Sequence, residues 1–133
     1  MPYRFDFDSA NKILRGRFSG KVTDHQLKEY YLRIGPLMAR TRSGAGITDF
    51  SSARSSTVTT GTVRQLAASA PAMPSPRQLS FIIAAKPPVL GLARAFQSDG
   101  WQTRPNMYIV RTLLEVCVIL GVYTLKFDPL PLD

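Results

Sequence analysis

Few residues of this sequence have the chemistry of a catalytic or metal centre. His25 is the only histidine, which excludes any site that needs two imidazoles. It falls near the start of an expected surface helix, where we expect a solvated or capping role. Cys117 is the only cysteine and lies in an apolar stripe, where a buried thiol packs as a small hydrophobic side chain. No Cys and His spacing and no acidic cluster indicates a metal site. The sequence therefore predicts no catalytic residues, no cofactor and no metal.

Asp49 is the carboxylate with the best placement for binding. It ends an apolar segment, on the side where open α/β sheets bind ligands. Its side chain can also accept N–H bonds from Ser51 or Ser52 in an Asx turn, and we prefer this structural role. Trp101 is a candidate anchor for a partner, because tryptophan is enriched at binding hot spots, and simple packing is the alternative.

Hydroxyl side chains are concentrated directly after Asp49. Residues 51–62 contain eight Ser or Thr, which favours an exposed loop leading into a helix. We expect this loop, from Asp49 to Gly61, to form the contact surface for a partner or ligand, or a phosphorylation site. Its candidate residues are Asp49, Ser51, Ser52, Ser55, Ser56, Thr57, Thr59 and Thr60.

The elements before this loop are an opening hairpin, a helix and a short strand. Residues 3–8 and 12–18 alternate with period two, which predicts two paired strands. Thr23 and Gln26 have capping-box spacing, so a helix begins there, and Gly35 with Pro36 should weaken or kink it near its end. Residues 45–50 predict a buried strand that ends at Asp49.

The second half alternates helices with strands. A helix with the stripe 63, 66, 67 and 70 should stop at Pro71, and residues 71–76 form a proline-rich connector. Residues 79–85 predict the central strand, buried on both faces. Pro87 and Pro88 can open a third helix that ends at Gly100, and residues 107–110 predict another strand. A last helix begins with a second capping box at Thr112 and Glu115 and closes at residue 121.

The fold class that follows is α/β. We expect a single mixed, mostly parallel sheet with an N-terminal antiparallel hairpin, covered by about four helices. Residues 1–122 form this domain, and residues 123–133 form a C-terminal tail that lies as an edge strand or stays partly loose. An edge strand from Tyr123 to Phe127 would allow a homodimer across a two-fold axis.

Composition limits the class of protein. A chain of 133 residues with 44% hydrophobic residues is the size of one domain. The longest apolar stretch runs from Leu113 to Val122 and is interrupted by Glu115. Its length is about half the roughly 20 residues that a membrane-spanning helix needs. The first eight residues lack the apolar run of a signal peptide, so we expect a cytoplasmic protein that is not integral to a membrane. Seventeen Lys and Arg against nine Asp and Glu give a net charge of +8, but they are scattered, which favours a solvated basic surface over nucleic-acid binding.

The element order resembles the SpoIIAA-like branch of STAS domains, the sulfate-transporter and anti-sigma-factor-antagonist family. The resemblance covers roughly residues 3–122. It is carried by the opening hairpin, DFSSARSSTVTTGTVRQLA at 49–67, GLARAF at 91–96 and residues 112–121. It implies a regulatory module that acts through partner contacts. In phosphorylated members a serine follows an aspartate at the start of the second helix. That aspartate is missing here and Thr59 is the nearest equivalent, so the resemblance does not support partner switching by phosphorylation, and we expect Thr59 to be a helix N-cap.

The leading hypothesis is therefore a non-enzymatic regulatory or interaction module of STAS-like type that binds a protein partner. One alternative is a carrier of a small apolar ligand or lipid, because STAS and Sec14-like lipid-carrying domains are similar in fold. A basic nucleic-acid-binding domain is a third, less favoured, hypothesis, and binding should then weaken steeply with salt. An enzyme remains open only if a pocket near Asp49 recruits a substrate.

Overall fold

The computed structural model describes residues 2–71 and 77–131, so most of the proline-rich connector at 71–76 lies outside the described residues. The chain alternates strands and helices in the order that the sequence predicts. The elements are β1 (Tyr3–Asp8), β2 (Ile13–Val22), α1 (Asp24–Thr41), β3 (Ala45–Ser56), α2 (Thr60–Ala68), β4 (Leu79–Ile83), α3 (Val89–Gly100), β5 (Met107–Val110), α4 (Leu113–Leu120) and β6 (Asp128–Leu130).

The strands form one sheet in the order β5-β4-β3-β2-β1-β6. The pairs β2–β3, β3–β4 and β4–β5 are parallel, whereas β1 pairs antiparallel with both β2 and β6. The predicted mixed, mostly parallel sheet with an antiparallel hairpin is therefore confirmed. The middle of the sheet is β2 and β3, so the prediction that residues 79–85 are central is corrected: β4 is second from the edge. It is nevertheless paired on both sides, and its last three residues are buried.

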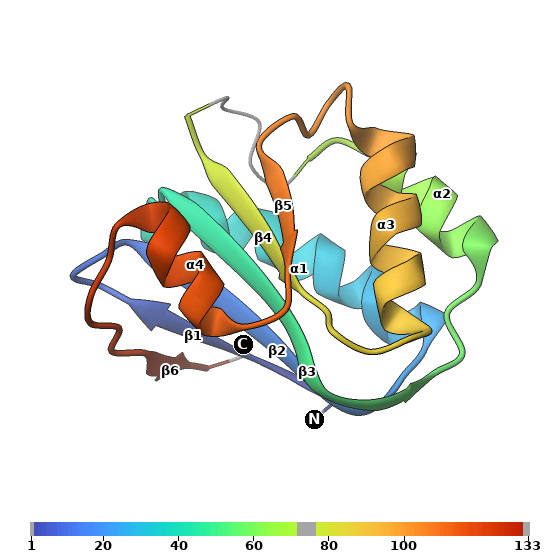
Figure 1. The fold of residues 1–133 in the computed structure, drawn as a ribbon, viewed down its shortest axis with the longest axis horizontal. Coiled ribbons are helices and arrows are strands. Elements are labelled where there is room, and N and C mark those ends of the chain that lie inside the picture. Colours follow the sequence, from blue (N-terminus) through green and yellow to red (C-terminus); the bar gives the residue numbers. More distant parts are fainter. Residues whose placement is uncertain (1, 72–76, 132–133) are drawn as a thin grey trace.

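Helices cover both faces of the sheet. Figure 1 shows α4 in front of the sheet and α1 behind it, with α2 and α3 side by side. Residues of α1, α2 and α3 share one apolar core, in which the rings of Tyr3, Phe5, Phe18 and Tyr30 contact one another. A smaller core under α4 contains Phe81, together with other residues of the opposite sheet face. None of the described helices combines the length and the apolar character needed to cross a membrane.

Helix α1 starts as predicted but runs further than expected. Thr23 and Gln26 form the complete capping box. The helix then continues through Pro36 to Thr41, so the expected kink near Pro36 does not end it. Pro36 has no N–H, so the carbonyl four residues earlier lacks its helical hydrogen bond. Pro36 is exposed, so this carbonyl lies on the outer side of the helix, where water can bind it. Ile34 and Met38 are buried on either side of Pro36, and this packing keeps the last turns helical.

Strand β3 also extends beyond its predicted end at Asp49. It continues to Ser56 because β2 extends in parallel to Val22, and the two strands stay paired. Two register shifts interrupt this extension, and Ala53 is buried on it. The second half of β3 therefore projects past β4, which pairs only with residues 45–49.

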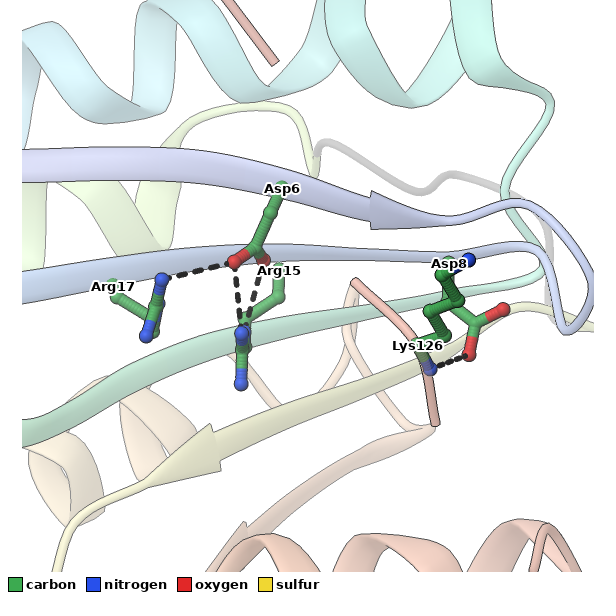
Figure 2. A network of polar contacts seen from close by, with 5 residues as sticks. All are labelled: Asp6, Asp8, Arg15, Arg17 and Lys126. Carbon is green, nitrogen blue, oxygen red and sulfur yellow. Dashed lines mark hydrogen bonds and ion pairs between the residues drawn. The ribbon is translucent and has the colours of Figure 1, made fainter. Parts of the chain in front are cut away.

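The C-terminal tail lies on the same face of the sheet as α4, where Leu125 and Phe127 pack against the smaller core. The segment from Tyr123 to Phe127 is not a strand, which corrects the predicted edge strand. Strand β6 follows it and pairs with β1 at the edge, a position that tolerates Pro129. The main chain of Lys126 donates to the Asp8 carboxylate at 3.1 Å, as Figure 2 shows.

An ion-pair cluster lies beneath this tail. Asp6 is buried and binds both Arg15, at 2.8 Å, and Arg17, at 3.1 Å (Figure 2). The Arg15 guanidinium also lies 3.9 Å from the centre of the Phe127 ring. A buried carboxylate needs such partners, so the tail and the cluster stabilise each other.

The last helix, α4, differs from its prediction in one contact. The Thr112 side chain accepts from the Glu115 N–H, but Glu115 in return accepts from the N–H of Arg111, one residue before the cap. The second capping box is therefore only half formed. Gly121 closes the helix in the left-handed conformation, as expected, with φ of 69°.

Candidate functional site

The hydroxyl-rich segment is part strand and part loop. Ser51, Ser52, Ser55 and Ser56 all lie in β3, which corrects the expectation that they belong to a loop. Only residues 57–59 connect β3 to α2. Ser51, Ser52 and Ser55 are exposed, so their side chains are accessible, although Ser52 and Ser55 are paired with β2 through their backbone.

The short connection is held firmly at both ends. The N–H of Thr57 donates to the Val22 carbonyl at 2.9 Å, and the N–H of Val58 donates to the Ser56 hydroxyl at 3.1 Å. The Val58 side chain packs against the main core. Thr57 is left exposed on a backbone that has little freedom to move.

Thr59 is the N-cap of α2, as its position predicted. Its hydroxyl oxygen accepts from the Thr62 N–H at 3.2 Å. Two further hydrogen bonds of Thr59 go to Asp24 at the start of α1, whose carboxylate accepts the Thr59 N–H at 2.8 Å and the Thr59 hydroxyl at 3.1 Å. These bonds, above all the one from the Thr59 N–H, hold the pKa of Asp24 below its usual value. The two helices therefore begin at a shared point.

Asp24 gives α2 the negative charge that its own sequence lacks. No acidic residue occurs in the first turn of α2, although the N-terminus of a helix favours negative charge. Asp24 supplies it from 35 residues away. The N–H and hydroxyl of Thr59 are thus already committed to a carboxylate, and a phosphoryl group on Thr59 would lie against like charge.

Asp49 has a structural role in this fold. It is buried, and one of its carboxylate oxygens accepts from the N–H and the hydroxyl of Ser51, at 2.8 and 2.6 Å. This is the Asx-type contact that the sequence indicates. Because Thr48 binds Tyr30 on the α1 side, the next residue points to the opposite face of the sheet. The structure therefore does not bring the Asp49 side chain together with the threonines at the start of α2.

Trp101 lies near the other end of α2. It is 61% exposed and follows Gly100, the last residue of α3. Gly100 packs against Ala67: an added Cβ there would lie 3.5 Å from the Ala67 Cβ. Since α2 has nine residues, its two ends are about 13 Å apart, so Trp101 and Thr59 belong to separate surface regions.

Arg104 caps this C-terminal end of α2, although no sequence motif marks it as a functional residue. Its guanidinium donates to the carbonyls of Leu66, Ala67 and Ser69 at 2.8–3.1 Å. It also stacks on Phe96, 4.8 Å from the ring centre. Burial lowers the pKa of Arg104, while nearby Tyr31 opposes the shift. The one hint in the sequence is that α2 has no basic residue in its last turn.

The only histidine and the only cysteine lie in different elements, His25 next to Asp24 at the start of α1 and Cys117 in α4. The His25 ring is exposed at the start of α1 and lies 3.8 Å from the Glu29 carboxylate. Cys117 is half-buried in α4. Within residues 2–71 and 77–131, no three His, Cys, Asp or Glu side chains are grouped so that they could hold a metal ion.

An apolar cavity lies inside the core, between the end of the β2–β3 pair and the helices. It is lined by residues such as Leu27, Phe50, Val63 and Phe96, and its volume is about 40 Å³. Small-molecule pockets usually measure about 300–1,000 Å³. A lipid would therefore require the helices to move apart from the sheet.

Comparisons with known proteins identify the fold. No protein-family model matches the sequence, and no curated protein matches it. The structure of the anti-sigma factor antagonist SpoIIAA in its unphosphorylated form matches with a TM-score of 0.59 and 9% identity, over 88% of this chain and 94% of that one. The structure of the Bacillus cell fate determinant SpoIIAA in the phosphorylated form matches with a TM-score of 0.52 and 15% identity, over 89% and 98%. The chain has the SpoIIAA-like, STAS-like fold, as the sequence resemblance predicted.

Proposed function

We propose that this protein is a non-enzymatic regulatory module of STAS-like type that binds a protein partner through residues 49–61. The observation that carries the proposal is the exposed, hydroxyl-bearing start of α2, which Asp24 fixes to α1. SpoIIAA, which has the same fold, is by name an anti-sigma factor antagonist, a protein that acts on other proteins.

The geometry favours binding over turnover. Thr57, Thr59 and Thr60 are exposed on a backbone held by hydrogen bonds from β2 and α1. A surface that is ordered before binding loses less conformational entropy when a partner docks. Threonine hydroxyls and methyl groups give short polar and apolar contacts. The Thr59 hydroxyl does donate to the Asp24 carboxylate, but the lowered pKa of Asp24 makes it a weak general base.

Within residues 49–61, we assign different roles to the two ends. The threonines at the start of α2 and the exposed Ser55 would contact the partner. Asp49 would act indirectly, because its bonds to Ser51 shape β3 from the far face of the sheet. Binding would not require phosphorylation, since the carboxylate of Asp24 already occupies the N–H of Thr59.

Site-directed photo-crosslinking tests this proposal. A photoreactive amino acid replaces Thr57 in one variant and Lys126, an exposed residue of the tail, in a control variant. In cells of the native host, we expect Thr57 to crosslink to one defined protein and Lys126 not to do so. The purified partner should then bind the unmodified chain, and Thr57→Arg should weaken binding at least about tenfold, or 1.4 kcal/mol. Equal crosslinking from both positions, unchanged binding by Thr57→Arg, or specific substrate turnover by the purified chain would each refute the proposal.

A further inference from the structure

A groove runs between α1 and the C-terminal end of α2, away from residues 49–61. One wall consists of Lys28, Leu32 and Gly35 on α1, and the other includes Gln65 and Ser69. Its volume is about 550 Å³, more than ten times that of the core cavity. Gly35 contributes to the hollow because it has no side chain.

The groove combines an apolar contact with positive charge. Leu32 is 78% exposed, so it offers an apolar contact at the surface of the groove. Among the described residues that line the groove, the charged ones are Lys28 and Arg104, both basic. Residues 50–98, which include all of α2, contain five Lys or Arg and no Asp or Glu.

The two basic side chains of the groove, Lys28 and Arg104, form no ion pair with a described acidic residue. Arg104 donates to main-chain carbonyls and to Thr103, and none of the ion pairs between described residues includes it. The two acids of α1 are also committed elsewhere: Asp24 binds Thr59, and Glu29 binds Tyr3 and faces His25 and Arg33. Lys28 interacts with the charge of Asp24 but forms none of these ion pairs, so both basic side chains can attract a carboxylate that enters the groove.

We propose that this groove docks an acidic segment of the protein partner, with an apolar side chain placed on Leu32 and carboxylates beside Lys28 and Arg104. The inference rests on the proposed function and adds a second contact to it, at the opposite end of α2. Charge complementarity selects an acidic partner and would also speed its association.

The probe for this inference is an amphipathic peptide of about twelve residues, with leucines spaced three and four apart and glutamates between them. The ¹⁵N-labelled full chain is titrated with this peptide and followed by NMR. We expect saturable shifts at the amides of Lys28, Leu32 and Ser69. A peptide with lysines in place of the glutamates should give none of these shifts.

Two variants and a matched control make the test specific. Leu32→Asp should weaken peptide binding at least about tenfold, through lost apolar contact and added repulsion. Leu114→Asp is the control, because Leu114 is almost as exposed, at 72%, but lies on α4. Lys28→Glu should weaken binding of the glutamate peptide and allow the lysine peptide to bind.

Each contrary outcome has a defined meaning. Shifts spread over the whole surface, or equal losses in Leu32→Asp and Leu114→Asp, would overturn the proposal in favour of unspecific charge attraction. A thymidine oligonucleotide that shifts the same amides with equal or higher affinity would overturn it in favour of nucleic acid. If a partner crosslinks at Thr57 but the peptide gives no shifts, docking in the groove is refuted and the proposed function stands. If the peptide binds in the groove but no partner crosslinks, the proposed function is refuted instead.

Discussion

The two ends of α2 are stabilised in opposite ways by residues that are distant in sequence. At the N-terminus, Asp24 accepts two hydrogen bonds from Thr59 and supplies a negative charge. At the C-terminus, Arg104 donates to three carbonyls and supplies a positive charge. Both charges complement the helix dipole, which is positive at the N-terminus and negative at the C-terminus. A helix without suitable charges of its own thus obtains them from α1 and from the segment after α3.

The two contacts differ in burial, and burial decides their energetic weight. Arg104 is partly buried, and its planar guanidinium binds several acceptors at once. The bonds between Asp24 and Thr59 are exposed to solvent, so water can replace a lost bond there. We therefore expect the C-terminal contact to control the stability of the fold, and the N-terminal contact to control the local order of the proposed binding surface.

The largest expected effect comes from Arg104→Ala. Removal of the guanidinium leaves the carbonyls of Leu66 and Ala67 without this donor and exposes Phe96. We expect the free energy of unfolding to fall by about 2–4 kcal/mol, measured by urea denaturation. Arg104→Lys keeps the charge without the planar fork and should lose about half as much. Equal stability of Arg104→Ala and the unchanged chain would refute the role of this contact.

Thr59→Ala should have a smaller effect at the other end. The variant loses the N-cap hydroxyl that accepts from Thr62 and donates to Asp24. A loss of about 1 kcal/mol is expected in the same denaturation experiment. Thr60→Ala is the matched control, because Thr60 is exposed and follows the cap, and it should change stability little.

Asp24→Asn should lower the melting temperature less than Thr59→Ala does. The amide keeps an acceptor oxygen for the Thr59 N–H but removes the negative charge. The sensitive measurement is hydrogen exchange, which should become faster at the amide of Thr59 and in the first turn of α2. If exchange accelerates equally along all of α2, the contact does not act locally and the proposed difference between the ends is wrong.

The stability of these variants should depend on pH differently at the two ends of α2. The folded pKa of Asp24 lies below its unfolded value of about 3.9, so its contribution is complete above that value and is lost as pH falls through the folded pKa. The difference in stability between the unchanged chain and Asp24→Asn should therefore persist at neutral pH and close below about pH 4. The difference for Arg104→Ala should stay constant from about pH 4 to pH 8, because the guanidinium remains charged. If the difference in stability between the unchanged chain and Asp24→Asn persists at low pH, the charge of Asp24 does not stabilise the start of α2.

Sequence patterns predicted those features that depend on neighbouring residues. Thr23 and Gln26 start α1 as expected, because a capping box involves only residues three positions apart. The order of strands and helices followed from periodicity, and with it the fold class. Asp49 adopted its predicted Asx contact for the same reason, since Ser51 is two residues away.

Features that depend on tertiary pairing could not be predicted in this way. Strand β3 extends past Asp49 only because β2 extends beside it, and α1 passes Pro36 because buried side chains follow it. The contacts of Asp24 with Thr59 and of Arg104 with α2 span at least 35 residues. No local pattern encodes such pairs, although the uncharged termini of α2 indicate where partners are needed.

Hydrogen–deuterium exchange of the full chain, with and without its purified protein partner, tests whether residues 57–68 form the binding surface. We expect slower exchange in the bound state at residues 57–68, from the loop through α2, and unchanged exchange in α4. Protection confined to α4 or to the edge strands, with residues 57–68 unchanged, would contradict this expectation.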